Sequence, residues 1–167
     1  DDPAWREAPA LGLVPHATER RLRRRLPTEA RVLYDDRALY VSLRCTIPAR
    51  DVAAQTFQND GSVYGDECAE IFISPGLDFC RYFELDFNAL NARYDGMGFP
   101  YYLPTHRWNP VWRHAARVYE DHWTAEAAVP FASLGRTAPA DGDAWLFNLA
   151  RCSGPIRVGE WPYQLYH

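Results

Sequence analysis

The feature that most constrains the fold is a pair of alternating segments in residues 64–88, which read YGDECAEIFISPGLDFCRYFELDFN. Apolar residues occupy every second position of both segments: Ala69, Ile71, Ile73, Phe83, Leu85 and Phe87. A period of two marks β-strands with one face on a core. The sequence therefore predicts two strands joined by a Pro-Gly turn. One register for such a hairpin pairs Ala69 with Phe83 and so places Cys68 opposite Glu84.

The other face of this predicted hairpin is unusually polar. It carries Glu70, Glu84 and Asp86 beside the rings of Phe72 and Tyr82. Carboxylates mixed with aromatic rings suit a ligand that has both hydroxyl groups and apolar faces, such as a sugar. The hairpin alone is equally compatible with a solvated outer face.

Further strand pairs are predicted along the chain. Residues 31–46 alternate around Asp35 and Asp36, residues 115–130 alternate around Asp121, and residues 145–152 read as another strand. A short strand is expected near residues 92–95, a single helical turn at 130–135, and a long aromatic loop at 96–110. With 13 Pro, 10 Gly and 167 residues, the chain is predicted to be one all-β domain. We expect an antiparallel two-sheet β-sandwich of jelly-roll or immunoglobulin-like type.

Charge and hydropathy narrow the classes of partner. The formal net charge is −4, which argues against nucleic acid. Five Arg lie within residues 20–25, and a solvated strand edge explains them more simply than a phosphate site. No apolar run approaches the roughly 20 residues that cross a bilayer. The sequence starts at Asp1-Asp2 without the apolar stretch of a signal peptide, as a mature secreted chain also would.

The four cysteines, Cys45, Cys68, Cys80 and Cys152, show no C-x-x-C spacing. A zinc site is therefore not expected from the sequence, and free, partly buried thiols are. A bridge between Cys68 and Cys80 would be diagonal and strained in the predicted register.

Two other classes of protein have candidate residues in this sequence. A glycosidase would use an acid and base drawn from Glu67, Glu70, Glu84 and Asp86, but Glu67 and Glu70 fall on opposite strand faces. A haem-binding sandwich would use Met97 with one of the histidines, His106, His114 and His122. We expect His114 and His122 to cap a hairpin instead. Trp5, Trp123 and Trp145 are expected in the core.

The order of several motifs resembles one known family. These motifs are DDPAW, YDDRALYVSLRC, GDECAEIFISPG, YFELDFNALNARYDG, WTAEAAVPFASLG and DGDAWLFNLAR. Together they resemble a family 9 carbohydrate-binding module over almost the whole chain. The resemblance implies a β-sandwich that binds sugars without cleaving them and that is usually appended to secreted polysaccharide-degrading enzymes.

The resemblance also implies a ligand site in which two rings clamp a sugar. Its residues in this sequence are Tyr64, Glu70, Arg93, Asn148, Arg151 and Trp161. Tyr64 and Trp161 would stack on the sugar, and the others would hold its hydroxyl groups. Tyr64 stands where the family pattern has Trp, which predicts weaker stacking. A domain that has lost sugar binding and serves as a structural or interaction module is therefore a further alternative.

The remaining expectations concern the ligand, metals and location. The expected ligands are glucan- or xylan-derived sugars or their chain ends, and the domain is expected to be a secreted or periplasmic monomer. Structural calcium is implied by the resemblance, with Asp35, Asp36, Asp60 and Asp66 as loop candidates, although no D-x-D-x-D spacing singles them out. The family usually continues through another strand, so the domain at residues 1–167 either lacks its last strand or extends beyond the chain.

Overall fold

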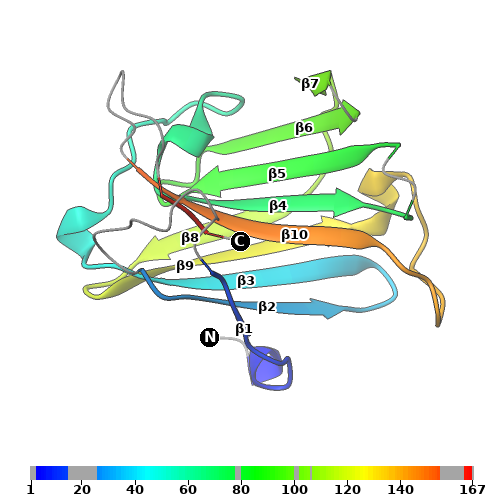
Figure 1. Cartoon of the computed structure of the whole chain (residues 1–167), viewed down its shortest axis with the longest axis horizontal. Helices are drawn as coiled ribbons and strands as arrows, with labels where there is room; N and C mark the ends of the chain where they lie inside the picture. Colours follow the sequence, from blue (N-terminus) through cyan, green and yellow to red (C-terminus); the bar gives the residue numbers. More distant parts are fainter. Residues whose placement is uncertain are drawn as a thin grey trace.

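The structure is a computed structural model of the chain, and it describes residues 3–14, 26–77, 80–99, 102–105, 107–154 and 164–166. Two antiparallel sheets face one another, with short 3-10 turns between the strands (Figure 1). The five-stranded sheet has the order β1 (Leu11–Gly12), β2 (Thr28–Tyr34), β3 (Ala38–Thr46), β9 (His122–Pro130) and β8 (Arg113–Val118). The six-stranded sheet has the order β11 (Gln164–Tyr166), β10 (Leu146–Ser153), β4 (Cys68–Ser74), β5 (Tyr82–Asn88), β6 (Arg93–Phe99) and β7 (Tyr102–Thr105). The predicted all-β sandwich is confirmed.

The core lies between the two sheets and comes from the alternating apolar residues. Ile71 and Leu85 are buried from the six-stranded sheet, and Leu43, Trp123 and Ala125 are buried from the other sheet. Burying one Leu or Ile side chain stabilises a fold by about 1.5–3 kcal/mol. The period-two pattern is therefore the main reason why these segments become strands that face each other.

The two hairpins predicted in the five-stranded sheet are confirmed. In the β2–β3 turn the Asp35 carboxylate accepts hydrogen bonds from the backbone N–H groups of Arg37 and Ala38, each at 2.8 Å. After β9 the chain forms the turn η5 (Phe131–Leu134) and ends it at Gly135, whose φ of 66° is left-handed. Glycine adopts that conformation without strain, which explains the stop at this position.

The register of the β4–β5 hairpin differs from the prediction. Ala69 pairs with Phe87 instead of Phe83, because the connection runs from Pro75 to Arg81 and is longer than a tight turn. The Ser74 hydroxyl closes this connection by donating to the Arg81 carbonyl at 2.7 Å. The register moves by an even number of residues, so the same side chains still share a face.

The aromatic segment at residues 96–110 is not a single loop, contrary to the prediction. β6 continues to Phe99 and β7 follows, with a register irregularity between them. Trp108 packs on Phe83 with ring centroids 4.6 Å apart, and Trp112 is buried. Trp108 therefore extends the core, whereas Phe99 in the same segment is 45% exposed.

The tryptophan and cysteine predictions are largely confirmed. Trp123 is fully buried and Trp145 packs against the core, but Trp5 lies half-buried on the turn η1 (Pro3–Arg6), outside the core. All four cysteines are free thiols; Cys80 is exposed and the other three are buried. Within the described ranges, no helix has the length and apolar character needed to cross a membrane. The arginine-rich residues 20–25 lie outside the described residues.

Candidate functional site

The face of the six-stranded sheet that points away from the core carries a cluster of polar and aromatic side chains. Strand pairing aligns Ala150, Glu70, Asp86 and Tyr94 in one row across β10, β4, β5 and β6. The next row contains Asn148, Phe72, Glu84 and Gly96. Directly paired residues lie on the same side of a sheet. We call this surface the polar face and define it by Glu70, Phe72, Tyr82, Glu84, Asp86, Tyr94 and Asn148.

The three carboxyl groups of the polar face are unusual in their burial. Asp86 is wholly buried and Glu70 is 6% exposed. Burial raises the pKa of Glu70, and burial together with the charges of Glu70 and Glu84 raises the pKa of Asp86 well above its usual range. Burial and the nearby Glu70 charge raise the pKa of Glu84 to about 7. A carboxyl group with a pKa of about 7, such as Glu84, can both donate and accept hydrogen bonds at neutral pH.

The aromatic rings flank the carboxyl groups at the more open side of this face. Phe72 and Tyr82 lie with ring centroids 6.5 Å apart. The Tyr82 ring covers Gly98, where an added Cβ would lie 2.2 Å from the ring. Tyr94 is half-buried beside Asp86. Rings next to fixed carboxyl groups can contact the C–H surfaces of a ligand whose hydroxyl groups are hydrogen-bonded.

Of the six predicted site residues, the structure brings Glu70 and Asn148 together on the polar face. Asn148 is exposed on β10, one row from Glu70. Tyr64 lies on the turn η4 (Val63–Gly65), just before β4, and its side chain is 43% exposed. Trp161 lies outside the described residues.

Arg93 and Arg151 point to the opposite side of the same sheet. Arg93 pairs with Phe87 in the strand register, its Nε lies 3.5 Å from Asp95 Oδ1, and its guanidinium lies over the Trp112 ring. Arg151 pairs with Ala69 and is fully buried between the sheets. The alternation of side chains along a strand thus separates both guanidinium groups from Glu70.

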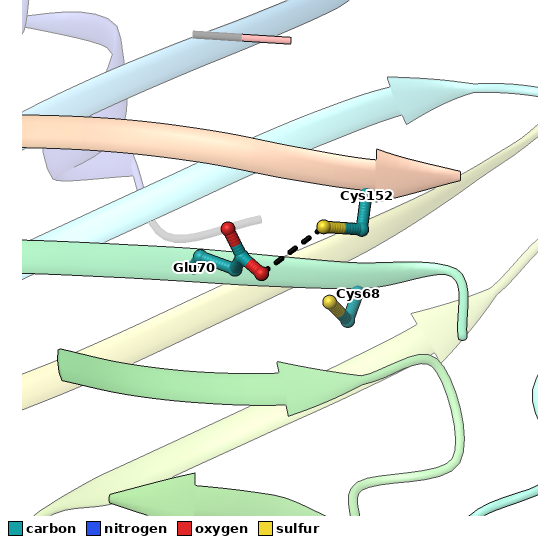
Figure 2. Close-up of side chains that lie close together, drawn as sticks. All are labelled: Cys68, Glu70 and Cys152. Atoms are coloured by element: carbon teal, nitrogen blue, oxygen red, sulfur yellow. Dashed lines mark hydrogen bonds between the residues drawn. The ribbon is translucent and has the colours of Figure 1, made fainter. Parts of the chain in front are cut away.

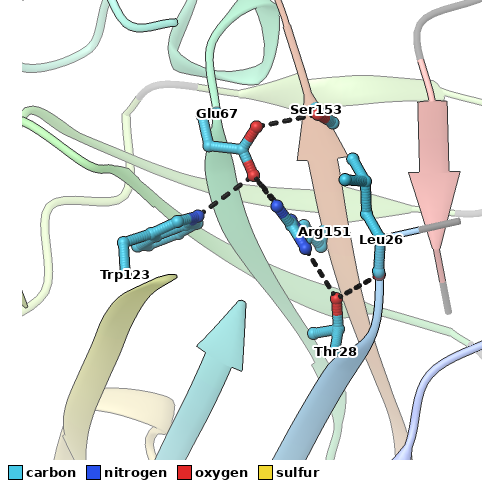
Figure 3. A network of polar contacts seen from close by, with 6 residues as sticks. All are labelled: Leu26, Thr28, Glu67, Trp123, Arg151 and Ser153. Carbon is cyan, nitrogen blue, oxygen red and sulfur yellow. Dashed lines mark hydrogen bonds and ion pairs between the residues drawn. The ribbon is translucent and has the colours of Figure 1, made fainter. Parts of the chain in front are cut away.

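Arg151 is the centre of a buried polar network that joins the two sheets (Figure 3). Its Nε donates to Glu67 Oε1 at 2.6 Å, and its Nη1 donates to the Thr28 hydroxyl at 3.0 Å. Glu67 also accepts from Trp123 Nε1 at 3.0 Å and from the Ser153 hydroxyl at 2.8 Å. A buried charge needs such partners, so Arg151 has a structural role in this arrangement.

A cavity of about 610 Å³ lies away from the polar face. It lies over the outer side of the five-stranded sheet, and Trp5, Tyr40, Arg113 and Glu126 are among its lining residues. Its walls contain apolar and charged groups, but none of the clustered carboxyl groups described above. Volume alone does not make it the better candidate, because oriented polar groups give a site its specificity.

The enzyme and haem alternatives can be compared with this geometry. Glu67 and Glu70 point to opposite faces, as predicted, and Glu67 is held by Arg151. His114 Nε2 lies 3.1 Å from the Asn91 carbonyl, and His122 contacts Asp121 and stacks on Tyr119. His122 therefore lies at the β8–β9 turn, as predicted, whereas His114 contacts the β5–β6 connection of the other sheet and does not cap the hairpin.

The four calcium candidates do not converge. The Asp35 carboxylate accepts a backbone hydrogen bond within the β2–β3 turn, and Asp36 is exposed beside Arg37. Asp66 is buried and accepts from the backbone N–H groups of Gln55 and Thr56 and from Asn88 Nδ2. Among the described residues, the one group of three ligand atoms close enough for a metal is Cys68, Glu70 and Cys152. No three of the predicted aspartates come together in this way among the described residues, and structural calcium stays a prediction.

Several residues of the polar face were not among the predicted site residues. Glu84 and Asp86 were visible as one polar face of the hairpin, but the resemblance did not point to them. Tyr94 follows Arg93 in the sequence, so strand alternation could have assigned it to the side opposite Arg93. The pairing of Cys68 with Cys152 had no sequence signal, because it depends on β10 lying beside β4.

Comparison with solved structures shows the same fold. A protein from Bacteroides uniformis has 16% sequence identity and a TM-score of 0.76, with 96% of this chain and 77% of that chain covered. A carbohydrate-binding module of family 9 from Caldicellulosiruptor kristjanssonii, solved with cellotriose, has 14% identity and a TM-score of 0.72 over 99% of this chain and 75% of that chain. A family 9 module from the same organism, solved with glucose, has 15% identity and a TM-score of 0.72 over 99% of this chain and 77% of that chain.

No curated protein matches the sequence. A family model does match, over residues 1–157, and its description is carbohydrate family 9 binding domain-like. The match covers nearly the whole chain and agrees with the two-sheet fold and with the ordered sequence motifs. The chain therefore belongs to the carbohydrate family 9 binding domain-like family, whose members are non-catalytic binding modules.

Proposed function

We propose that this domain binds glucan- or xylan-derived sugars, or the ends of such chains, on its polar face. The observation that carries the proposal is the row of carboxyl groups beside aromatic rings on one sheet face of a family 9 domain. The cellotriose and glucose complexes of two fold neighbours support this class of ligand.

The residues of this face have complementary roles in the proposal. Glu70 and Glu84 bond to sugar hydroxyl groups, and Asn148 contributes an amide that can both donate and accept. An ionised carboxyl group makes a stronger hydrogen bond than a neutral group does. Tyr64, which lies on η4, and Trp161 stack on the sugar. Arg93 and Arg151 support the sheet from its core side.

The proposal is tested by isothermal titration of the domain with glucose, cellobiose and xylobiose, and with their reduced alditols. Binding to the sugars but not to the alditols would identify a reducing-end site. Replacing Glu84→Gln should weaken binding about tenfold, since a hydrogen bond to a charged group contributes about 1.5–3 kcal/mol. Trp161→Ala should abolish binding while the far-UV circular dichroism stays native.

A matched control separates the polar face from the large cavity. Trp5→Ala changes the cavity wall on the other sheet and should leave the sugar affinity unchanged. Loss of binding in Trp5→Ala with retention in Glu84→Gln would move the sugar site to the five-stranded sheet. No heat with any sugar would favour the alternative of an interaction domain without sugar binding.

We further propose that the domain works outside the cytoplasm as a monomer attached to or accompanying a glycoside hydrolase. Membership of a family of binding modules supports this role. The role predicts that the domain sediments with insoluble cellulose or xylan, and that soluble cellobiose releases it. Failure to sediment with either polysaccharide, despite binding of the soluble sugars, would contradict the targeting role alone.

A further inference from the structure

Two thiols and a carboxyl group meet at the buried end of the polar face. Cys68 and Glu70 lie on β4, and Cys152 lies beside them on β10 (Figure 2). Their sulfur and oxygen atoms all lie within 4.8 Å of one another, and the Cys152 thiol donates to Glu70 Oε1 at 3.0 Å. All three side chains are buried.

Strand register brings a fourth side chain to this cluster. Cys152 pairs directly with Cys68, and Glu70 pairs directly with Asp86. These four residues therefore occupy two adjacent positions on β4 and the positions opposite them on its neighbours. The ligand atoms within 4.8 Å of one another are those of Cys68, Glu70 and Cys152, so the Asp86 carboxylate must turn toward them to reach the same ion.

Asp86 is an independent sign of a missing partner at this cluster. It is wholly buried, and neither of its carboxylate oxygens has a hydrogen-bond donor. Glu84 is close enough to bond to it, but it is also a carboxyl group, so the two bond only while they share a proton. A buried carboxylate without a donor or a cation is costly.

The charges around Asp86 all have the same sign. Glu70 pairs directly with it across the strands, and Glu84 lies two residues before it on the same face of β5. The nearest arginines on these strands, Arg93 and Arg151, point to the core side of the sheet. A cation among the four donors would remove this repulsion.

We propose that Cys68, Cys152, Glu70 and Asp86 together bind one Zn²⁺ ion. Two thiolates and two carboxylate oxygens complete the four-coordinate shell that Zn²⁺ takes in structural sites. Thiolate ligands disfavour Ca²⁺ and Mg²⁺, which take oxygen ligands. Binding displaces the thiol protons to solvent. The ion would also keep the Glu70 carboxylate ionised at the buried end of the polar face.

The test uses the full chain, kept reduced and free of sugar, so that its outcome is independent of the proposed function. Zn²⁺ is titrated in competition with a chromophoric chelator, and bound metal is counted by mass spectrometry. One ion per chain is expected. Co²⁺ in place of Zn²⁺ should give a thiolate-to-cobalt charge-transfer band.

Matched variants locate the ion. Cys152→Ser should remove the cobalt charge-transfer band or weaken it strongly, and it should lower Zn²⁺ affinity at least about tenfold, the scale on which even outer-shell partners act. Cys80→Ser, at the exposed thiol, should change neither. Asp86→Asn should lower Zn²⁺ affinity in the same way. The fold should persist, because Asn has nearly the same shape as Asp and the Asp86 oxygens accept no hydrogen bond from a donor group that the change would leave unpaired.

Three outcomes would overturn the proposal. The first is the absence of stoichiometric Zn²⁺ binding by the reduced chain. The second is binding that neither Cys152→Ser nor Asp86→Asn weakens. The third is a disulfide between Cys68 and Cys152 in the isolated protein, seen as two titratable thiols instead of four in denaturant.

Discussion

Arg151 illustrates how the surroundings of a single residue decide its role. Its guanidinium is enclosed between the sheets, where Glu67 and Thr28 bind it, and no part of it reaches the polar face. A residue whose position in the sequence suggested a sugar contact is therefore part of the link between β10 and β2.

Arg151→Met should lower the free energy of unfolding by about 3–5 kcal/mol, because it leaves the Glu67 charge buried without its partner. Urea denaturation measures the change. Arg50→Met, at an exposed arginine, is the matched control and should be nearly silent. A change in Arg151→Met no larger than in Arg50→Met would contradict the structural role.

His114 makes the stability depend on pH. Its ring lies 4.8 Å from the Trp112 ring and 5.1 Å from the Phe87 ring, measured between centroids. Burial lowers the pKa of His114 from its usual 6.5; the Arg93 charge lowers it further, while the Asn91 carbonyl and Asp95 oppose the shift. The folded protein then binds fewer protons than the unfolded chain.

Because of this difference, the stabilising contribution of a neutral His114 is complete above about pH 6.5 and is lost as the pH falls toward the lowered pKa. As the pH is lowered through this window, the free energy of unfolding should decrease more steeply in the native protein than in His114→Gln. Equal slopes in the two proteins would assign the pH dependence to other groups.

At the scale of elements, the end of β10 and the turn η4 approach each other closely. A Cβ on Gly154 would lie 2.4 Å from the Gly65 carbonyl oxygen and 3.0 Å from the Asp66 carbonyl carbon, both of them backbone atoms. The turn η4 carries Tyr64, so this contact positions one of the proposed stacking residues. Only glycine allows the two backbones to come so close.

Gly154→Ala should therefore destabilise the domain by about 1–3 kcal/mol, the usual cost of overpacking. It should also weaken sugar binding, since η4 must move. Gly12→Ala is the matched control, because a Cβ there meets nothing within 4 Å. Thermal unfolding and sugar titration of both variants check the prediction, and equal behaviour of the two would show that β10 and η4 are not tightly packed.

The strands themselves could be predicted because each has a local signal. The segments of β2, β3, β8, β9 and β10 alternate with a period of two, and turn residues separate the hairpins. The length of the β4–β5 connection and the existence of β7 were not predicted. The β4–β5 connection has a partner far along the chain, since Arg136 Nη2 donates to the Pro75 carbonyl at 3.3 Å, and β7 pairs with β6 in an irregular register.

At the scale of the whole molecule, sugar binding should be coupled to unfolding, because the polar face exists only when β10, β4, β5 and β6 are assembled. At a sugar concentration about 100 times the dissociation constant, the folded state gains about 2.7 kcal/mol. For a domain of this size, the midpoint of thermal unfolding should rise by about 5–10 °C. Scanning calorimetry with cellobiose and with its alditol measures the effect. Equal unfolding midpoints with and without saturating cellobiose would contradict the coupling.

The sequence alone determined the fold class, the hairpins, the core face of each strand and the family, since these follow from local periodicity, turn residues and the order of motifs. Tertiary structure decided which side chains share a site. Side-chain alternation placed Arg93 and Arg151 on the core side, and the β10–β4 pairing placed Cys152 beside Cys68. The physical reason is that strand periodicity is a local property, whereas the neighbour of a strand depends on how distant segments bury their apolar faces together.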